Sequence, residues 1–273
     1  MSALHPVVAV TGSSGAGTTT VKTAFEHIFR RLDLTAAVIE GDSFHKHDRA
    51  GMRKAVRQAE LAGTHISHFG PEANLLRDLQ GLFEFYGRTG GGQRRFYIHD
   101  VDEGKARGSE PGTFTTWEDL PEATDLLFYE GLHGAMVNDD VDIAKHVDLK
   151  IGVVPIVNLE WIQKIHRDTS HRGYCERAVT STILRRMPDY VEHIAPQFSL
   201  TDINFQRVPT VDTSNPFVAR DIPTPDESFA VIRFSNPKKF NIDFPYLMSM
   251  LKGSFMSRRN TIVVPGGKMG LAL

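Results

Sequence analysis

The segment VVAVTGSSGAGTT, from Val7 to Thr19, is the strongest indication of the fold in this chain. It opens with a short apolar run that predicts a buried strand, and a helical pattern from Thr18 to Arg31 follows the glycines. Glycines let the chain curl so that successive N–H groups point at phosphate oxygens, and the helix adds the positive end of its dipole. We therefore predict an ATP-binding phosphate loop made of Gly12, Ser13, Ser14, Gly15, Ala16, Gly17, Thr18 and Thr19.

One position of this loop departs from the usual motif. Thr18 stands where a lysine normally reaches the β- and γ-phosphates. Another cation must then take over, or the loop binds phosphate without catalysis. A glycine-rich turn that only opens a helix is the simpler alternative. The hydroxyl of Thr19 is expected to bind Mg²⁺.

Strand and helix patterns alternate through the first two-thirds of the chain, which predicts a parallel sheet covered by helices on both faces. We expect one α/β domain over residues 1–273, with a mixed central sheet flanked by helices. A helical lid is expected at about 156–195, and antiparallel strands at about 203–265. The predicted strands are Val7–Thr11, Thr35–Glu40, Arg94–His99, Asp125–Tyr129, Val147–Val154, Asn204–Val211, Phe229–Phe234 and Thr261–Val264. The predicted helices are Thr18–Arg31, His47–Ala62, Glu72–Tyr86, Ile156–His171, Glu176–Ile194 with a kink at Pro188, and Tyr246–Leu251, while Asp100–Pro121 reads as a loop.

Composition excludes several classes of function. The net charge of −2 gives no global attraction for nucleic acid or anionic lipid, so an anionic ligand needs a local cluster of positive groups. With Cys175 as the single cysteine, an internal disulfide is impossible and a cysteine-based zinc site is not expected. We find no signal-peptide pattern and no apolar run of membrane-spanning length, and we expect a cytoplasmic protein.

Two acids follow predicted strands at the edge where ligands bind to open parallel sheets. Asp42 follows the second strand and is our candidate for the general base that accepts a hydroxyl proton. Glu130 ends an apolar strand and is a candidate Mg²⁺ ligand. A helix cap or turn is the structural alternative for Asp42, and a solvated loop acid for Glu130.

A positive helix follows later in the chain. From Trp161 to Arg186 there are six lysines and arginines against two acids, and Lys164, Asp168 and Arg172 are spaced i, i+4, i+8. Such a face suits a lid that closes over a triphosphate and supplies charge to the transition state. Lys164 could replace the missing loop lysine, and Asp168 could be a second Mg²⁺ carboxylate. A solvated face with internal salt bridges is the alternative.

A second polar cluster comprises His45, Arg49, Arg53, Tyr97 and His99. His45 and Arg49 are four residues apart. Cationic groups of this kind bind the phosphate of a sugar phosphate, and the other donors bind its hydroxyls. For any one histidine alone, a surface or core role is the simpler interpretation.

Long strings of the sequence resemble the bacterial phosphoribulokinases, which are P-loop NTPases with a fold like the nucleoside monophosphate kinases. The matching strings are GSSGAGTT at 12–19, EGDSFH at 40–45, FYEGLHG at 128–134, VVPIVNLEWIQKIHRD at 153–168 and NFQRVPTVDTSNPF at 204–217. Members of this family also carry threonine in place of the loop lysine. The resemblance covers nearly the whole chain, although members usually continue into another C-terminal helix beyond Leu273.

The resemblance implies transfer of the γ-phosphoryl group of ATP to the C1 hydroxyl of ribulose 5-phosphate, with Mg²⁺ as cofactor. It implies catalytic roles for Asp42, Lys164, Arg167 and Asp168, and metal contacts for Thr19, Glu130 and Asp168. It implies sugar-phosphate binding by His45, Arg49, Tyr97, His99, Arg172 and Arg186. It also implies a homo-octamer that NADH activates and AMP inhibits through Arg31, Arg233 and Arg258.

Two other interpretations remain open. A kinase of the uridine kinase type would phosphorylate a nucleoside, and would not need the cations around an acceptor phosphate. A non-catalytic nucleotide sensor would explain Thr18, but a pure binding protein has no need of the base Asp42. The sequence does not identify the physiological acceptor.

Overall fold

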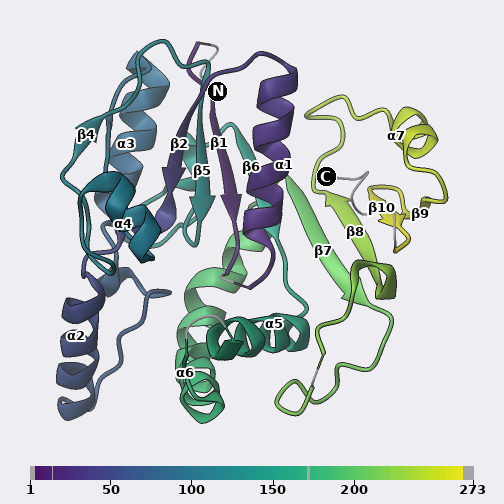
Figure 1. Ribbon diagram of the computed structural model, residues 1–273. Helices are drawn as coiled ribbons and strands as arrows, with labels where there is room; N and C mark the ends of the chain where they lie inside the picture. Colours follow the sequence, from purple (N-terminus) through teal and green to yellow (C-terminus); the bar gives the residue numbers. More distant parts are fainter. Residues whose placement is uncertain (1–3, 14, 171–172, 220, 267–273) are drawn as a thin grey trace.

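The computed structural model describes residues 4–13, 15–170, 173–219 and 221–266. Within these ranges, one central sheet has eight strands in the order β2-β5-β1-β6-β7-β8-β10-β9 (Figure 1). The parallel part consists of β2 (Ala36–Glu40), β5 (Leu126–Gly131), β1 (Val7–Thr11), β6 (Leu149–Val153) and β7 (Ile203–Pro209). The antiparallel part consists of β8 (Ser228–Phe234), β10 (Thr261–Val264) and β9 (Phe255–Arg258). The predicted mixed sheet is confirmed.

Helices cover both faces of the parallel part because its strands are apolar on both faces. In β1, Val10 packs with Phe29 of α1 (Thr18–Arg31), whereas Val7 and Ala9 pack with α3 (Leu76–Thr89). Successive residues of a strand point to opposite faces, so a continuous apolar run serves two cores at once.

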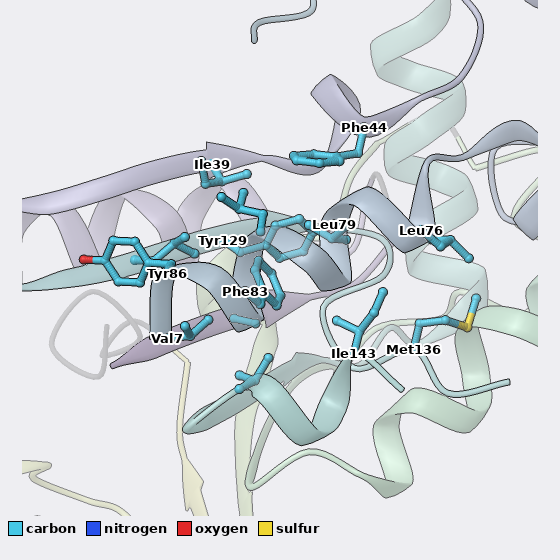
Figure 2. Close-up of a cluster of buried hydrophobic side chains, with 14 of the residues drawn as sticks. Val7, Ile39, Phe44, Leu76, Leu79, Phe83, Tyr86, Tyr129, Met136 and Ile143 are labelled. Carbon is cyan, nitrogen blue, oxygen red and sulfur yellow. The ribbon is translucent and has the colours of Figure 1, made fainter. Parts of the chain in front are cut away.

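The core beneath α3 is built around aromatic side chains (Figure 2). Phe83 of α3 and Tyr129 of β5 are fully buried, and their ring centroids lie 5.4 Å apart in an edge-to-face arrangement. Val7 and Ile39, from two further strands, pack into the same cluster. This core fixes the parallel strands relative to one another, and therefore fixes where their carboxyl ends lie.

The two predicted lid helices, α5 (Val157–Ser170) and α6 (Glu176–Asp189), lie beyond the carboxyl ends of the parallel strands (Figure 1). The predicted helix Glu176–Ile194, expected to be kinked or divided at Pro188, is divided one residue after it, since α6 ends at Asp189 and a π-helical turn spans Tyr190–Ile194. The buried amide of Gln197 follows this turn and donates to the carbonyl oxygens of Leu132 (2.9 Å) and His193 (2.8 Å). It also accepts a hydrogen bond from the Thr11 hydroxyl, so the end of the helical segment is tied to the end of β1.

The segment 93–121 differs from expectation. The predicted strand Arg94–His99 is only partly confirmed, because β3 (Gln93–Arg94) pairs with β4 (Glu118–Asp119) in a separate small sheet and Tyr97 pairs with Phe114 in an isolated bridge. Between these two pairings, the Arg95 guanidinium donates to the carbonyl oxygens of Ser43 and His45 and stacks on Phe114, which attaches this segment to residues 43–45. The predicted loop 100–121 contains α4 (Val101–Arg107), which Asp100 caps.

The remaining helices, α2 (Arg49–Leu61) and α7 (Phe244–Met250), lie close to their predicted positions. The strand β9 was not predicted. Among the described residues, no helix has the length and apolar character needed to cross a membrane.

The aromatic core gives a stability prediction with a control in the same helix. Phe83→Ala should lower the free energy of unfolding by about 3–5 kcal/mol, because it opens a cavity beneath a fully buried ring. Phe85→Ala removes the same ring from a position that is 46% exposed, and should cost less than about 1 kcal/mol. Urea denaturation of both variants tests this, and equal losses would contradict the core described here.

Candidate active site

The phosphate loop joins β1 to α1 as predicted. Gly15 (φ 118°) and Gly17 (φ 101°) both have positive φ angles, which residues other than glycine rarely adopt. Gly17 precedes α1, and no described side chain caps this helix, so its first N–H groups face the loop without a side-chain acceptor. The predicted residue Ser14 lies outside the described residues, and the side chain of Thr19 is not described.

The ends of β2 and β5 bring Asp42 and Glu130 to the same edge as the loop. Glu130 pairs with Val10 of β1 and Glu40 of β2, while Asp42 lies in the short 3₁₀ turn Gly41–Phe44. Gly41 and Gly131 make this possible, because a Cβ on Gly41 would lie 2.5 Å from the Tyr129 hydroxyl and 2.8 Å from the Gly131 Cα.

Glu130 has the environment of a cation ligand. Burial raises the pKa of Glu130, while the Thr18 hydroxyl and the Lys22 ammonium act in the opposite direction. Lys22 itself is ion-paired with Glu40 at 2.5 Å, and Glu130 has no ion-pair partner among the described residues. A partly buried carboxyl group without its own counter-ion fits Mg²⁺, which takes one or two protein carboxylates together with phosphate oxygens and water.

Asp42 is surrounded by histidines. Its carboxylate lies 3.2 Å from Nε2 of His45 and 3.7 Å from Nε2 of His99. Burial would raise the pKa of Asp42, but the hydrogen bond from His45 and the nearby histidines lower it well below its usual range. Asp42 is therefore a carboxylate throughout the physiological pH range, and 43% of its side chain is open to a ligand.

The side chain of His45 is held by groups that the sequence did not indicate. Its Nδ1 lies 2.8 Å from Oδ1 of Asn74, whose amide nitrogen donates to the carbonyl oxygens of His68 and Gly70. The His68 ring stacks on His45 with centroids 4.0 Å apart. Burial and the charge on His45 lower the pKa of His68 to about 2, so His68 is neutral.

Of the other predicted sugar-side residues, Arg49 and Tyr97 contact His99, and Arg186 interacts with Asp42. Arg49 donates to the carbonyl oxygen of His99 at 3.0 Å, and the rings of Tyr97 and His99 lie 5.0 Å apart. Arg186, from α6, interacts electrostatically with both Asp42 and Asp168. Its Nε finds no hydrogen-bond partner among the described residues, which leaves a donor for a ligand. Arg172 lies outside the described residues.

The predicted cationic face of α5 is present. Lys164 Nζ lies 2.7 Å from Asp168, and Arg167 Nε lies 3.0 Å from the other oxygen of that carboxylate. Burial would raise the pKa of Asp168, but the two cations lower it. Burial also lowers the pKa of Lys164, against the effect of Asp168. The base of the Lys164 side chain lies next to the loop, since its Cβ would be 3.8 Å from a Cβ on Gly15.

The predicted effector and metal residues are only partly brought together. Arg233 and Arg258 flank Thr261 across β8, β10 and β9, and Arg31 lies at the end of α1; all three are exposed.

Among the described residues, no cluster of three or more His, Cys, Asp or Glu side chains could hold a metal ion alone. Glu130 and Asp168 would therefore bind Mg²⁺ only together with nucleotide phosphates.

Four side chains of this site were missed: His68, Asn74, Arg95 and Glu160, the last of which accepts a hydrogen bond from Ser13 of the loop. Residues 45–68 contain four of the twelve histidines, which is a signal that could have pointed to His68. Arg95 lies in the aromatic string RRFY, but nothing in the sequence shows that it contacts the turn around Asp42. Asn74 and Glu160 have no local signal, because their partners lie 29 and 147 residues away in the chain.

Comparisons with known proteins agree with this geometry. The model of the phosphoribulokinase / uridine kinase family matches residues 7–214. The chain is 61% identical to phosphoribulokinase from Nitrobacter vulgaris, over 98% of this chain and 92% of the relative. It is 62% identical to phosphoribulokinase from Xanthobacter flavus, over 100% of this chain and 94% of the relative. The structure of phosphoribulokinase from Rhodobacter spheroides superimposes with a TM-score of 0.89 at 57% identity, covering 98% of this chain and 93% of that one. The chain belongs to the phosphoribulokinase / uridine kinase family.

Proposed function

We propose that this enzyme transfers the γ-phosphoryl group of ATP to the C1 hydroxyl of ribulose 5-phosphate, giving ribulose 1,5-bisphosphate and ADP. Relatives named phosphoribulokinase, 61% identical over almost the entire chain, support this substrate. The observation that carries the proposal is the ionised Asp42, which lies beside His45 and His99 at the sheet edge that also carries the phosphate loop, with Arg49 bonded to the His99 carbonyl oxygen. A base with histidine and arginine side chains close by suits an acceptor that is itself phosphorylated.

Each part of the site has a distinct task in this reaction. The loop N–H groups and the start of α1 bind the phosphates of ATP. Asp42 orients the acceptor hydroxyl and accepts its proton as the phosphoryl group moves. His45, Arg49, Tyr97, His99, Arg172 and Arg186 bind the sugar phosphate. Mg²⁺, when bound through Thr19, Glu130 and Asp168, neutralises charge on the transferring group.

Lys164 and Arg167 take over the task of the missing loop lysine. Charge on the transferring phosphoryl group is spread over its equatorial oxygens, and cations fixed nearby stabilise it more than water does. We propose that α5 and α6, within residues 156–195 of a single kinase domain, form a lid that carries these cations. On binding nucleotide, Lys164 would exchange part of its contact with Asp168 for a phosphate oxygen.

Regulation and assembly are proposed on the resemblance to bacterial phosphoribulokinases. The exposed arginines Arg31, Arg233 and Arg258 would bind NADH as activator and AMP as inhibitor, in a homo-octamer. The single cysteine, Cys175, supports a cytoplasmic location.

A substrate assay separates the two enzyme candidates. ATP consumption should be fast with ribulose 5-phosphate and at background level with uridine, because the cations around Asp42 lack a partner when the acceptor has no phosphate. Mass spectrometry of the product checks that a bisphosphate forms. Turnover with uridine alone would favour the uridine kinase type, and tight ATP binding without turnover of either acceptor would favour a nucleotide sensor.

Asp42→Asn tests the base. The amide keeps the size of the side chain but does not accept a proton, so kcat should fall by roughly 10²-fold or more, the range of general-base contributions. The Kd for ATP, measured by calorimetry, should change little. Asp102→Asn removes a carboxylate that is 96% exposed and serves as the matched control with normal kcat. A normal kcat in Asp42→Asn would remove Asp42 from the mechanism.

Lys164→Met tests the lid cation. Loss of charge that acts on the transition state should lower kcat by roughly 10²-fold or more, while KM for ribulose 5-phosphate changes by less than about threefold. Lys105→Met, at a position that is 75% exposed, is the control. Steady-state kinetics of both variants measures the difference. An unaltered kcat in Lys164→Met would mean that the charges on this face of α5 form salt bridges in solvent and do not act in catalysis.

A further inference from the structure

The side chain of Glu160 is buried between α5 and the phosphate loop. It lies in the first turn of α5 and is 6% exposed. The hydroxyl of Ser13, which is itself fully buried, donates a hydrogen bond to its Oε1. A Cβ on Gly15 would lie 3.3 Å from both the Cγ and the backbone oxygen of Glu160. Glu160 therefore contacts two residues of the loop whose N–H groups are proposed to bind phosphate.

Glu160 also shares a face of α5 with the proposed catalytic pair. Glu160, Lys164 and Asp168 are spaced i, i+4, i+8, so they line one stripe of the helix. The other charged or titratable groups that face Glu160 are Arg167 on the same helix, Tyr190 after α6, and Arg186, which lines the same small pocket.

The carboxyl group of Glu160 is an unfavourable neighbour for a triphosphate when it is ionised. Like charges a few ångströms apart in a partly dehydrated site repel one another strongly. Burial raises the pKa of Glu160 to about 7, against the effects of the Ser13 hydroxyl, Lys164 and Arg167. Near neutral pH the group can therefore gain a proton at little cost.

We propose that Glu160 is a positioning residue of the phosphate loop, which it holds through Ser13, and that it takes up a proton when ATP binds. The inference rests on the proposed use of ATP by this loop. In the neutral form Glu160 still accepts the hydrogen bond of Ser13 and no longer opposes the incoming phosphates. Protonation thus keeps the loop in place and removes the repulsion at the same time.

Because ATP binding and protonation of Glu160 are linked, the direction in which the affinity for ATP changes with pH can be worked out. Negative phosphates nearby raise the pKa of Glu160 above its value of about 7 in the free protein. Below pH 7 the group is already protonated, so binding needs no further proton. Above pH 7 the free protein must gain one, and the affinity for ATP falls as the pH rises.

Glu160→Gln removes the titration and keeps the shape and the hydrogen bond. The Kd for Mg·ATP, measured by calorimetry without acceptor, should be similar for this variant and the unmodified protein at pH 6. At pH 8 the unmodified protein should bind roughly tenfold more weakly than the variant, the effect of one linked proton. The ratio of the two Kd values cancels the ionisation of ATP, which is the same for both proteins. Glu176→Gln, which replaces an exposed carboxyl group on α6, is the control, and its Kd should equal that of the unmodified protein at both pH values.

Two further measurements make the test independent of a single variant. At pH 8, binding heats in two buffers of different ionisation enthalpy should show that the unmodified protein takes up close to one proton more than Glu160→Gln. Ser13→Ala removes a donor that lowers the pKa of Glu160, so proton uptake at pH 7 should fall below that of the unmodified protein.

A ratio of Kd values that stays constant from pH 6 to pH 8, with equal proton uptake, would overturn the role of Glu160 while leaving ATP binding intact. Failure of the unmodified protein to bind Mg·ATP at any of these pH values would instead overturn the proposed function, and with it this inference.

Discussion

The proposed site has to balance the charge of a triphosphate without a lysine in the phosphate loop. Thr18 occupies the lysine position, and its buried side chain is hydrogen-bonded to Glu130. Backbone N–H groups and the start of α1 supply only partial positive charge. We propose that α5 supplies the cations instead, because the Cβ of Lys164 lies beside Gly15 of the loop, and Lys164 and Arg167 both contact Asp168. In this proposal the position of the helix relative to β1 controls catalysis.

The proposed base and the proposed cations lie on different elements. Lys164 and Arg167 lower the pKa of Asp168 on α5, whereas histidines lower the pKa of Asp42 in the turn after β2. Arg186 interacts with both carboxylates and links the two sides. The buried amide of Gln197 ties the end of the helical segment to the end of β1, so the cations of α5 and α6 are attached to the strand that begins the phosphate loop.

The parallel sheet, the phosphate loop and the strand-end acids were predictable because each depends on local patterns: an apolar run, glycines and a following acid. The stripe of Lys164 and Asp168 was predictable from helical spacing. The small sheet of β3 and β4 was not predictable, because each of its two-residue strands is too short to give a pattern and its partner lies across a segment that reads as a loop. Glu160 and Asn74 were missed because each acts through a partner that only the folded chain places beside it.

A crystal structure with ADP and ribulose 5-phosphate bound together would show directly whether the loop and Asp42 hold the two reacting groups. We expect the β-phosphate of ADP within hydrogen-bond distance of the loop N–H groups, and the C1 hydroxyl within hydrogen-bond distance of a carboxylate oxygen of Asp42. The sugar phosphate group should contact Arg49 or Arg186. ADP bound away from the loop, or a C1 hydroxyl directed away from Asp42, would contradict this expectation.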